Sequence, residues 1–547
     1  GYPLSQFARE SDALLSKMDF GVVSGAFTPA ERFRRSENYF VQASYEKALA
    51  GYATLLKEGA FRERALMRSA IANIRLKRYK EGEKALREYL SLKDPSKKAE
   101  ALYWLAFASM RQGREDGVFE AEKALSENFR KSDERAKALL LIARLKAGKD
   151  PEGAALAYKA VLEDFGPSPA AEEAFWNMGW EAYSSGRFID AYDNFSMYLE
   201  SRPRGALSGQ FLYWKARAVE KLGRPEEAGV LFGLVCPSAP QSFYCLMAEV
   251  RGASRGSAAG EAARPLEVKT ISAAAASPVA APALESPLKK LPRYRTAEEL
   301  MLLGLGEQAS NEIDLIARSR QADKAALVEL AKLLYEASDF YRGFRIYRAH
   351  LSAADREEHL PLGYPMRLVE SVREKAPPEA ADPFLVAAVM REESHFNPGA
   401  VSPVGALGLM QIMPSTGKQI ARELGEGFRK GSLLDPSTSI RFGSWYLGQI
   451  LKRFSGDAIL AIAGYNAGPN AAARWAGTLP PETDEFVESI PYEETRGYVK
   501  RVLRSYAEFL KLGGEQFHGR VQRPAKPSID QPDMQNEANA SPGEAAF

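Results

Sequence analysis

Apolar residues recur at three- and four-residue intervals through most of the chain, which is the spacing of amphipathic α-helices. From residue 36 to about 252 such segments follow one another, with breaks at Gly113, Gly148, Gly186 and Gly223. These glycines are 35, 38 and 37 residues apart. A period of this length predicts helical pairs that each leave an apolar face uncovered, so that neighbouring pairs stack into an array.

One amphipathic helix recurs within these units, as YEKALAGYATLL, YKEGEKALREYL, AALAYKAVLEDF and FIDAYDNFSMYL. Its small alanines allow close contact between helices. We interpret the tryptophans of this region as the core of the repeats, and sugar stacking is the less favoured alternative. They are Trp104, Trp176, Trp180 and Trp214.

The pattern changes outside this array. Residues 1–35 form an N-terminal extension, 253–290 are rich in Ala, Pro and Ser and predict a flexible linker, and 513–547 are polar and predict a disordered tail. Further packed helices are expected at 291–360, and short helices separated by Gly and Pro form a last domain at 361–512. The predicted fold class is all-α, with a helical-repeat superhelix ahead of a compact helical domain.

Composition excludes several classes of protein. The 547 residues are 45% hydrophobic, and no run reaches the roughly 18 apolar residues of a membrane span. There is no N-terminal signal region, so we expect that any export signal has already been removed. A net charge of +2 argues against nucleic acid as a partner, and four unpaired histidines argue against a metal site. Cys236 and Cys245 are compatible with a local disulfide or with two buried thiols.

The stretch from Ala381 to Gly417 carries the candidate chemistry. Asp382 can cap a helix that starts at the following proline and ends before Asn397 and Pro398. Glu393 falls in the middle of that helix's apolar stripe and Glu392 at its edge, so we expect only Glu393 to point inward. The stripe consists of Val386, Val389 and Met390.

An inward carboxyl group among apolar side chains should have a raised pKa and so hold a proton near neutral pH, as a general acid must. The alternative is a glutamate in a surface ion pair. No second catalytic carboxylate is evident, because Asp435 and Asp457 are explained as helix caps and Asn466 does not ionise. A site with one acid fits glycoside cleavage in which the substrate supplies its own nucleophile.

Four segments, REESHFNP, SPVGALGLMQIMP, AGYNAGP and FVESIPYEETRGYV, occur in this order in the last third of the chain. They resemble the catalytic domain of the soluble lytic transglycosylases, which are goose-lysozyme-like enzymes that cleave peptidoglycan. The helical repeats resemble the degenerate tetratricopeptide repeats that precede this domain in the large members. The resemblance implies a lysozyme-like α-helical catalytic domain.

By this resemblance, Glu393 protonates the oxygen between N-acetylmuramic acid and N-acetylglucosamine and then deprotonates the muramyl C6 hydroxyl, leaving a 1,6-anhydromuramyl end. No cofactor is implied. The partner is the peptidoglycan strand, and a protein partner on the repeats is left open. The implied location is the periplasm, with outer-membrane association open.

The resemblance also implies substrate-binding residues, each with a structural alternative. Ser402 is alternatively a turn serine, Gln411 makes a structural hydrogen bond, and Glu488 pairs with Arg496. A neutral amide is common at position 392 in the family, so Glu392 adds a charge that should raise the pKa of Glu393 further. The implied substrate-binding residues are Ser402, Gln411, Met413, Tyr465, Asn466, Glu488 and Tyr498.

Two other functions fit the sequence less well. A hydrolytic muramidase of the goose-lysozyme kind would use the same acid with water as acceptor. A non-catalytic cell-wall scaffold would depend on the repeats alone, and the complete set of site residues argues against it. The sequence does not decide between cleavage from chain ends and within strands, the preference for stem peptides, or the oligomeric state.

Overall fold

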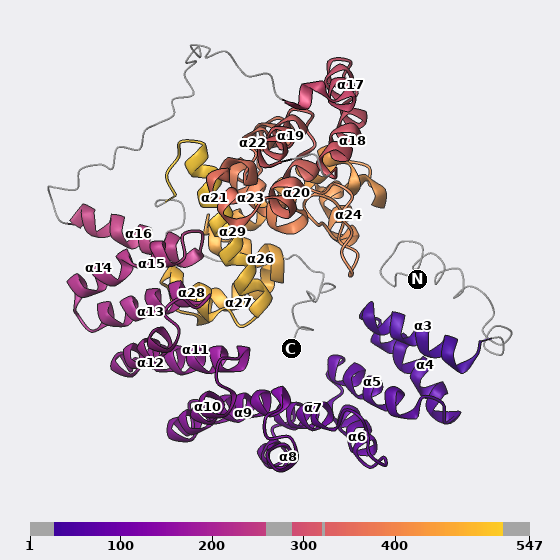
Figure 1. The fold of residues 1–547 in the computed structure, drawn as a ribbon, viewed down its shortest axis with the longest axis vertical. Coiled ribbons are helices and arrows are strands. Elements are labelled where there is room, and N and C mark those ends of the chain that lie inside the picture. Colours follow the sequence, from indigo (N-terminus) through magenta and orange to yellow (C-terminus); the bar gives the residue numbers. More distant parts are fainter. Residues whose placement is uncertain (1–26, 259–286, 320–322, 518–547) are drawn as a thin grey trace. The chain divides into compact units, whose positions relative to one another are not determined.

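The computed structural model describes residues 27–258, 287–319 and 323–517, which form two units, the first ending at Pro240 and the second beginning at Gln241 (Figure 1). All regular elements of these residues are helices, and extended backbone occurs only as isolated bridges. The all-α prediction is therefore confirmed. Most of the predicted N-terminal extension, linker and tail lies outside the described residues.

The first unit consists of consecutive helical pairs followed by one short helix. Each helix packs on the next along the chain, as the uncovered apolar faces of the repeats require. The pairs are α3 (Pro29–Val41) with α4 (Tyr45–Lys57), α5 (Arg62–Arg75) with α6 (Tyr79–Leu90), α7 (Lys98–Arg111) with α8 (Glu115–Asn128), α9 (Asp133–Lys146) with α10 (Pro151–Phe165), α11 (Pro169–Ser184) with α12 (Phe188–Ser201) and α13 (Ser208–Lys221) with α14 (Pro225–Gly233), and α15 spans Val235–Ser238.

The four glycines of the predicted breaks lie in the turns inside these pairs, with φ between 72° and 79°. Ala43 and Lys77 occupy the same place in the first two pairs, with φ of 55° and 61°. The turn therefore requires a left-handed residue, and glycine adopts this conformation at the least steric cost. The repeat extends two pairs further toward the N-terminus than its glycines indicate.

The tryptophans of the first unit pack as predicted for a core. Trp214 is fully buried. The rings of Trp180 and Trp176 meet it at centroid distances of 4.8 and 6.5 Å and stack on each other at 5.7 Å. Edge-to-face and stacked aromatic contacts of this kind add to the stabilisation from burial alone.

The second unit begins with α16, which the sequence analysis placed partly in the repeats, and continues with two hairpins. The turns of these hairpins contain Gly304 and Ser338 at φ of 73° and 61°, the same local geometry as in the first unit. The elements are α16 (Phe243–Ala258), η1 (Pro287–Lys290), α17 (Pro292–Leu302), α18 (Gly306–Ala317), α19 (Lys324–Glu336), α20 (Phe340–His350), α21 (Ala353–Glu358) and η2 (Leu360–Gly363).

The rest of the second unit is built around α23. Seven consecutive residues of α23, from Phe384 to Met390, are buried, because α22, α25 and α29 pack around it. A helix that is apolar on all sides is a central helix of its domain. The elements are α22 (Met366–Lys375), α23 (Pro383–Ser394), α24 (Pro414–Glu423), η3 (Lys430–Leu434), α25 (Pro436–Arg453), α26 (Ala458–Ala467), α27 (Pro469–Thr478), α28 (Thr483–Ser489) and α29 (Glu493–Leu512).

The structure bears on membrane-spanning helices and on the state of the two cysteines. Among the described residues, no helix has both the length and the apolar character needed to cross a membrane. Neither Cys236 nor Cys245 is a free thiol. The alternative of two buried thiols is therefore wrong.

Candidate active site

Both ends of α23 are fixed by local interactions. At its start, the Asp382 carboxylate accepts hydrogen bonds from the Phe384 backbone N–H at 2.9 Å and from the Tyr506 hydroxyl at 2.7 Å. At its end, His395 adopts a left-handed conformation with φ of 52°, which stops the helix. The predicted cap at Asp382 is confirmed, and the last turn of α23 carries Glu393.

Glu393 is partly buried, and the Tyr498 hydroxyl donates a 2.7 Å hydrogen bond to its Oε1. Burial raises the pKa of Glu393 to about 7, and the negative charges of Glu392 and Glu494 act in the same direction. The hydrogen bond from Tyr498 and the positive charge of Arg501 oppose this rise. Glu393 can thus hold a proton near neutral pH, as expected for a general acid.

Glu392 is partly buried too, and only 7% of its side chain is exposed, so the prediction that only Glu393 points inward is wrong. Its carboxylate lies 2.7 Å from Arg391 Nη1 and 3.3 Å from Arg501 Nε, and it accepts a 2.8 Å hydrogen bond from the Ser505 hydroxyl. The apolar stripe was a poor guide because packing partners surround α23. As expected, the charge of Glu392 raises the pKa of Glu393.

Ser402 lies at the base of a tight turn. Its Oγ accepts a 2.9 Å hydrogen bond from the Ala406 N–H, and its own N–H donates to the Ala406 carbonyl at 2.9 Å. Bridges from Leu407 to Val401 and Ile412 hold the turn in place. The turn role proposed for Ser402 is therefore present, and substrate binding by its hydroxyl stays a prediction.

Gln411 has a left-handed backbone with φ of 46°. Its side-chain amide nitrogen donates to the carbonyls of Gly408 at 2.8 Å and Ala400 at 3.3 Å. Both amide hydrogens are thereby engaged, and no hydrogen bond from the described residues reaches the amide oxygen, which can accept one from a ligand. Met413 is the partly exposed N-cap residue of α24, and its contact with sugar stays a prediction.

Tyr465 and Asn466 lie side by side in the last turn of α26. The Tyr465 hydroxyl donates a 2.7 Å hydrogen bond to the Met410 carbonyl. Burial and the charge of Glu393 raise the pKa of Tyr465, so this ring lies near the acid. The Asn466 side-chain oxygen accepts a 2.7 Å hydrogen bond from the Thr495 hydroxyl. The charge of Glu393 therefore acts on Tyr465, and its hydrogen bond with Thr495 ties Asn466 to α29.

Glu488 is 3% exposed. Its carboxylate lies 2.8 Å from Lys500 Nζ and accepts a 3.2 Å hydrogen bond from the Tyr244 hydroxyl of α16. The alternative role of Glu488, an ion pair, is therefore present, but its partner is Lys500 and not the predicted Arg496. Arg496 instead donates to the Ile490 carbonyl. Substrate binding by Glu488 stays a prediction, and both of its oxygens already have partners within the protein.

Glu494 is a carboxylate near the acid that the sequence analysis missed. It is exposed in the first turn of α29, one helical turn before Tyr498, and its charge raises the pKa of Glu393. The spacing of four residues in EETRGYV could have identified it, since residues four apart share one face of a helix.

The two aspartates assigned to helix caps have that role. Asp435 Oδ2 accepts a 2.8 Å hydrogen bond from the Thr438 N–H at the start of α25. Asp457 Oδ1 accepts bonds of 3.0 Å from the N–H groups of Ile459 and Leu460 at the start of α26. Both cap predictions are confirmed.

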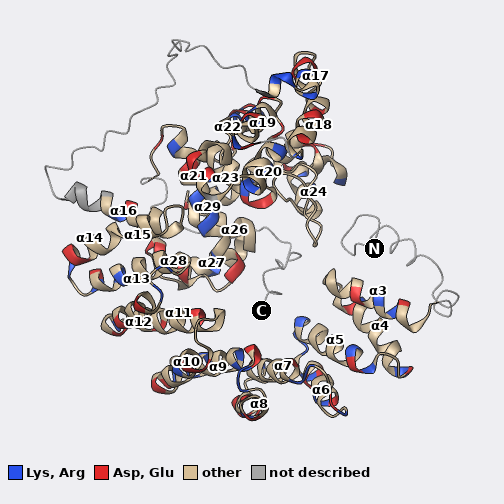
Figure 2. Cartoon of the chain, in the orientation of Figure 1, with Lys and Arg blue, Asp and Glu red and all other residues tan. Residues whose placement is uncertain are grey.

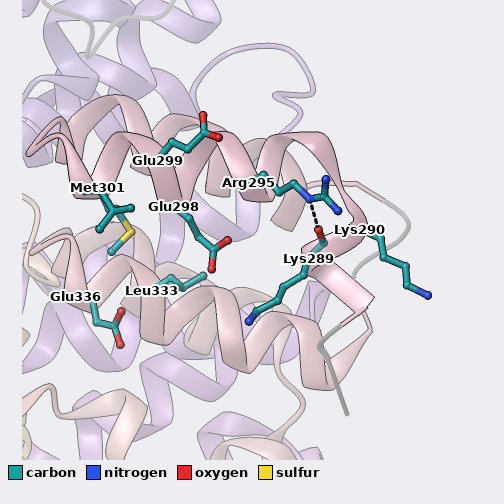
Figure 3. Close-up of a pocket in the computed structure, with 9 residues that line it drawn as sticks. Lys289, Lys290, Arg295, Glu298, Glu299, Met301, Leu333 and Glu336 are labelled. Carbon is teal, nitrogen blue, oxygen red and sulfur yellow. Dashed lines mark hydrogen bonds between the residues drawn. The ribbon is translucent and has the colours of Figure 1, made fainter. Parts of the chain in front are cut away.

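A separate hollow of the second unit lies between η1, α17 and α19 (Figure 3). Side chains of both charges line it, and Arg295 Nε donates a 2.8 Å hydrogen bond to the Lys289 carbonyl at its edge. No residue predicted to act on substrate lines this hollow. We therefore do not assign it to the candidate active site.

Residues 370–483 match the family described as Transglycosylase SLT domain. This range includes Glu393 and most of the predicted substrate-binding residues. Glu488 and Tyr498 lie beyond it.

Curated proteins give a similar result. The chain is 34% identical over 236 residues to the soluble lytic murein transglycosylases of Salmonella typhimurium and Escherichia coli K12. These alignments cover 42% of this chain and 36% of each relative. A transglycosylase of enterobacteria phage PRD1 is 40% identical over 91 residues, which is 17% of this chain and 31% of that protein.

The solved structure of an inactive mutant of the lytic transglycosylase Slt from Pseudomonas aeruginosa aligns with 92% of this chain and 85% of its own. Its sequence identity is 22% and its TM-score is 0.49. The sequence match and the residues around Glu393 concern the same part of the chain. Residues 370–483, which carry Glu393, are therefore similar to the Transglycosylase SLT domain family.

Proposed function

We propose that this protein is a peptidoglycan lytic transglycosylase in which Glu393 is the only catalytic acid and base. The observation that carries the proposal is the placement of Glu393 in the last turn of a buried helix, with a pKa of about 7 and a hydrogen bond from Tyr498. A carboxyl group with this pKa can both donate and accept a proton near neutral pH.

The reaction has two proton transfers. Glu393 first donates its proton to the oxygen between N-acetylmuramic acid and N-acetylglucosamine, and the bond from this oxygen to the anomeric carbon breaks. The N-acetyl carbonyl stabilises the electron-poor carbon. Glu393, now a carboxylate, then takes the proton of the C6 hydroxyl, whose oxygen bonds to the anomeric carbon. The product is a 1,6-anhydromuramyl end, and no water is consumed.

The surroundings of Glu393 suit these steps. The Tyr498 hydroxyl can stabilise the carboxylate that forms after the first transfer, because hydrogen bonds to an ionised acceptor are the stronger ones. The amide oxygen of Gln411 is available to an N–H or O–H group of the sugar. Tyr465, held by its bond to the Met410 carbonyl, offers its ring to the pyranose.

The substrate class of this proposal is the glycan strand of peptidoglycan, and the proposed location is the periplasm, where such strands occur. Association with the outer membrane and a protein partner on the repeats are further proposals. Binding of purified repeats to membranes or to periplasmic extracts would test them.

Incubation of the purified chain with peptidoglycan, followed by mass analysis of the soluble products, tests the reaction. We expect anhydromuramyl ends from the wild type and none from Glu393→Gln, with an unchanged circular dichroism spectrum. Glu493→Gln, which removes a nearby charge outside the site, serves as the control. Release of the same products by Glu393→Gln would refute the proposal.

A hydrolytic muramidase is a second candidate, and the negative charge of Glu494, which raises the pKa of Glu393, favours it. A second carboxylate could activate water, as in the glycosidases that use two acids. The products would then be one water heavier than anhydro products. If Glu494→Gln abolishes cleavage and the wild type gives reducing ends, the hydrolytic function replaces the one proposed here. No cleavage of any peptidoglycan by the wild type would favour the scaffold alternative.

A further inference from the structure

Two exposed arginines meet the last turn of α23 from different helices. Arg348 comes from α20 and reaches His395, and Arg501 comes from α29 and reaches Glu392. Both charges also act on His395. Lys and Arg residues recur along α29 (Figure 2). Two arginine side chains therefore border the end of the helix that carries Glu393, beside the carboxylates already described.

The side chain of Arg501 lies close to Gly497. Its Nη1 lies 3.2 Å from the point that a Cβ of Gly497 would occupy, so the guanidinium group folds back over the preceding turn of α29. Glu494, Gly497 and Arg501 share one face of the helix, at spacings of three and four residues. Tyr498, the residue after Gly497, donates a hydrogen bond to Glu393, and the charges of Glu494 and Arg501 act on the same acid, so this face borders it.

Arg501 keeps donor capacity. Its side chain is 57% exposed, and its one ion pair within the described residues is that of its Nε with Glu392 at 3.3 Å. The two terminal nitrogens of a guanidinium group match the two oxygens of a carboxylate. Glu392 thus orients Arg501 through Nε while the outer edge of the guanidinium group faces solvent.

Arg348 is exposed too, and its Nη1 lies 2.7 Å from Nε2 of His395. Burial and the nearby arginine charge lower the pKa of His395, so the ring is neutral at neutral pH and can accept this hydrogen bond. The ring also stacks on Phe344 at a centroid distance of 5.6 Å. Within the residues that the structure describes, Arg348 has no carboxylate partner.

The third arginine of this region differs from these two. The side chain of Arg391 is 19% exposed, and its Nη1 lies 2.7 Å from Glu392. Its Nε donates a hydrogen bond to the Gly363 carbonyl. Its guanidinium group lies over the rings of Tyr364 and Phe344. Its Nε and Nη1 donors are thus engaged within the protein. Arg391 is therefore structural, and its charge offsets that of Glu392. The charges of Arg348 and Arg501 are left to attract an anion.

We propose that Arg348 and Arg501 bind a carboxylate of the peptide attached to the muramyl residue at the cleaved bond. This inference rests on the proposed function, because it concerns the same substrate. N-acetylglucosamine is uncharged, and the lactyl carboxyl of the muramyl residue is consumed by its amide bond to the peptide. The anion that reaches these arginines therefore belongs to the peptide. The pair selects peptide-bearing strands over bare ones.

The test compares two substrates, peptidoglycan strands with their peptides and strands from which an amidase has removed them. The readout is the ratio of kcat/KM for the first substrate to kcat/KM for the second. We expect Arg348→Met and Arg501→Met each to lower this ratio by about tenfold, the effect of losing a hydrogen-bonded charge pair. Arg501→Lys should lower it less, and Lys511→Met, an exposed charge in the last turn of α29, should leave it unchanged.

The ratio separates binding of the peptide from an effect on the acid. Arg501 also acts on the charge of Glu393, but such an effect changes the rates on both substrates equally. An unchanged ratio in both methionine variants would overturn the proposal.

A binding measurement keeps this test independent of the proposed reaction. Calorimetry measures the affinity of the Glu393→Gln variant for a disaccharide with its peptide and for one without it. The same measurements are made on double variants that combine Glu393→Gln with each arginine substitution. We expect the arginine substitutions to weaken only the peptide-bearing ligand by about tenfold. If the wild type releases no anhydro product while this preference persists, the proposed reaction fails and the carboxylate site stands. Equal weakening of both ligands would refute the site.

Discussion

The hydroxyl of Tyr498 donates a 2.7 Å hydrogen bond to Oε1 of Glu393. This bond stabilises the ionised acid and so lowers its pKa, against the larger effect of burial, which raises it to about 7. Cleavage requires the protonated acid. The rate should therefore be highest below this pKa and fall by about tenfold per pH unit well above it.

Replacing Tyr498 by Phe removes a contact that lowers the pKa of Glu393. The pKa should rise, so the alkaline limb of the pH–rate profile should move to higher pH, even if the maximal rate is lower. Tyr506→Phe is the matched control, since Tyr506 also belongs to α29 but donates to Asp382. A limb that stays in place for Tyr498→Phe, or moves equally in both variants, would contradict this account.

Replacing Glu494 by Gln removes a negative charge that raises the pKa of Glu393. The pKa should fall, and the alkaline limb should move to lower pH. Glu493→Gln changes the neighbouring residue, whose charge is not among the causes of the shift, and should leave the limb where it is. The measurement is kcat/KM from pH 5 to 9. An alkaline limb that moves in Glu493→Gln and stays in place in Glu494→Gln would be inconsistent with the structure.

The pair of Glu488 and Lys500 is almost completely buried, with 2% and 18% of the side chains exposed. Glu488→Leu leaves the ammonium group of Lys500 without its counterion and should lower the free energy of unfolding by about 3–5 kcal/mol. Adding Lys500→Leu should restore much of this loss, because replacing both members of a buried ion pair by apolar side chains is often nearly neutral for stability. Urea denaturation of the single and double variants gives the coupling. Additive losses would show that the pair is not coupled.

Gly408 and Gly405 both have positive φ, 77° and 94°. A Cβ on Gly408 would lie 1.9 Å from the Leu433 carbonyl oxygen, whereas one on Gly405 would meet nothing within 4 Å. Gly405→Ala should therefore cost about 1 kcal/mol of backbone strain, and Gly408→Ala clearly more. Because Gln411 donates to the Gly408 carbonyl, only Gly408→Ala should also reduce activity strongly. Thermal melting and rate measurements of both variants check this.

Much of the fold could be predicted because its signals are local. The turns inside the helical pairs are left-handed, and four of the six carry glycine, which marks the repeat in the sequence. Ala43 and Lys77 adopt the same conformation without glycine, so the first two turns gave no signal. The caps at Asp382, Asp435 and Asp457 were equally predictable, since each depends only on the next few residues.

The parts that escaped prediction depend on tertiary contacts. Glu392 is buried because α29 supplies Ser505 and Arg501 to its carboxylate, and no periodicity within α23 contains this information. Glu488 finds its partners in Lys500 and Tyr244 for the same reason. The last of these belongs to α16, which is 244 residues away in sequence and which repeat periodicity assigned to the other unit.

Helix α29 holds α23 by hydrogen bonds at its two extremities, through Tyr506 to Asp382 and through Tyr498 to Glu393. A helix anchored to its neighbour at both termini cannot slide or rotate against it without breaking one of these bonds. The two should therefore behave as a single stiff body during turnover. Any opening that admits or releases a strand is then expected outside this pair of helices.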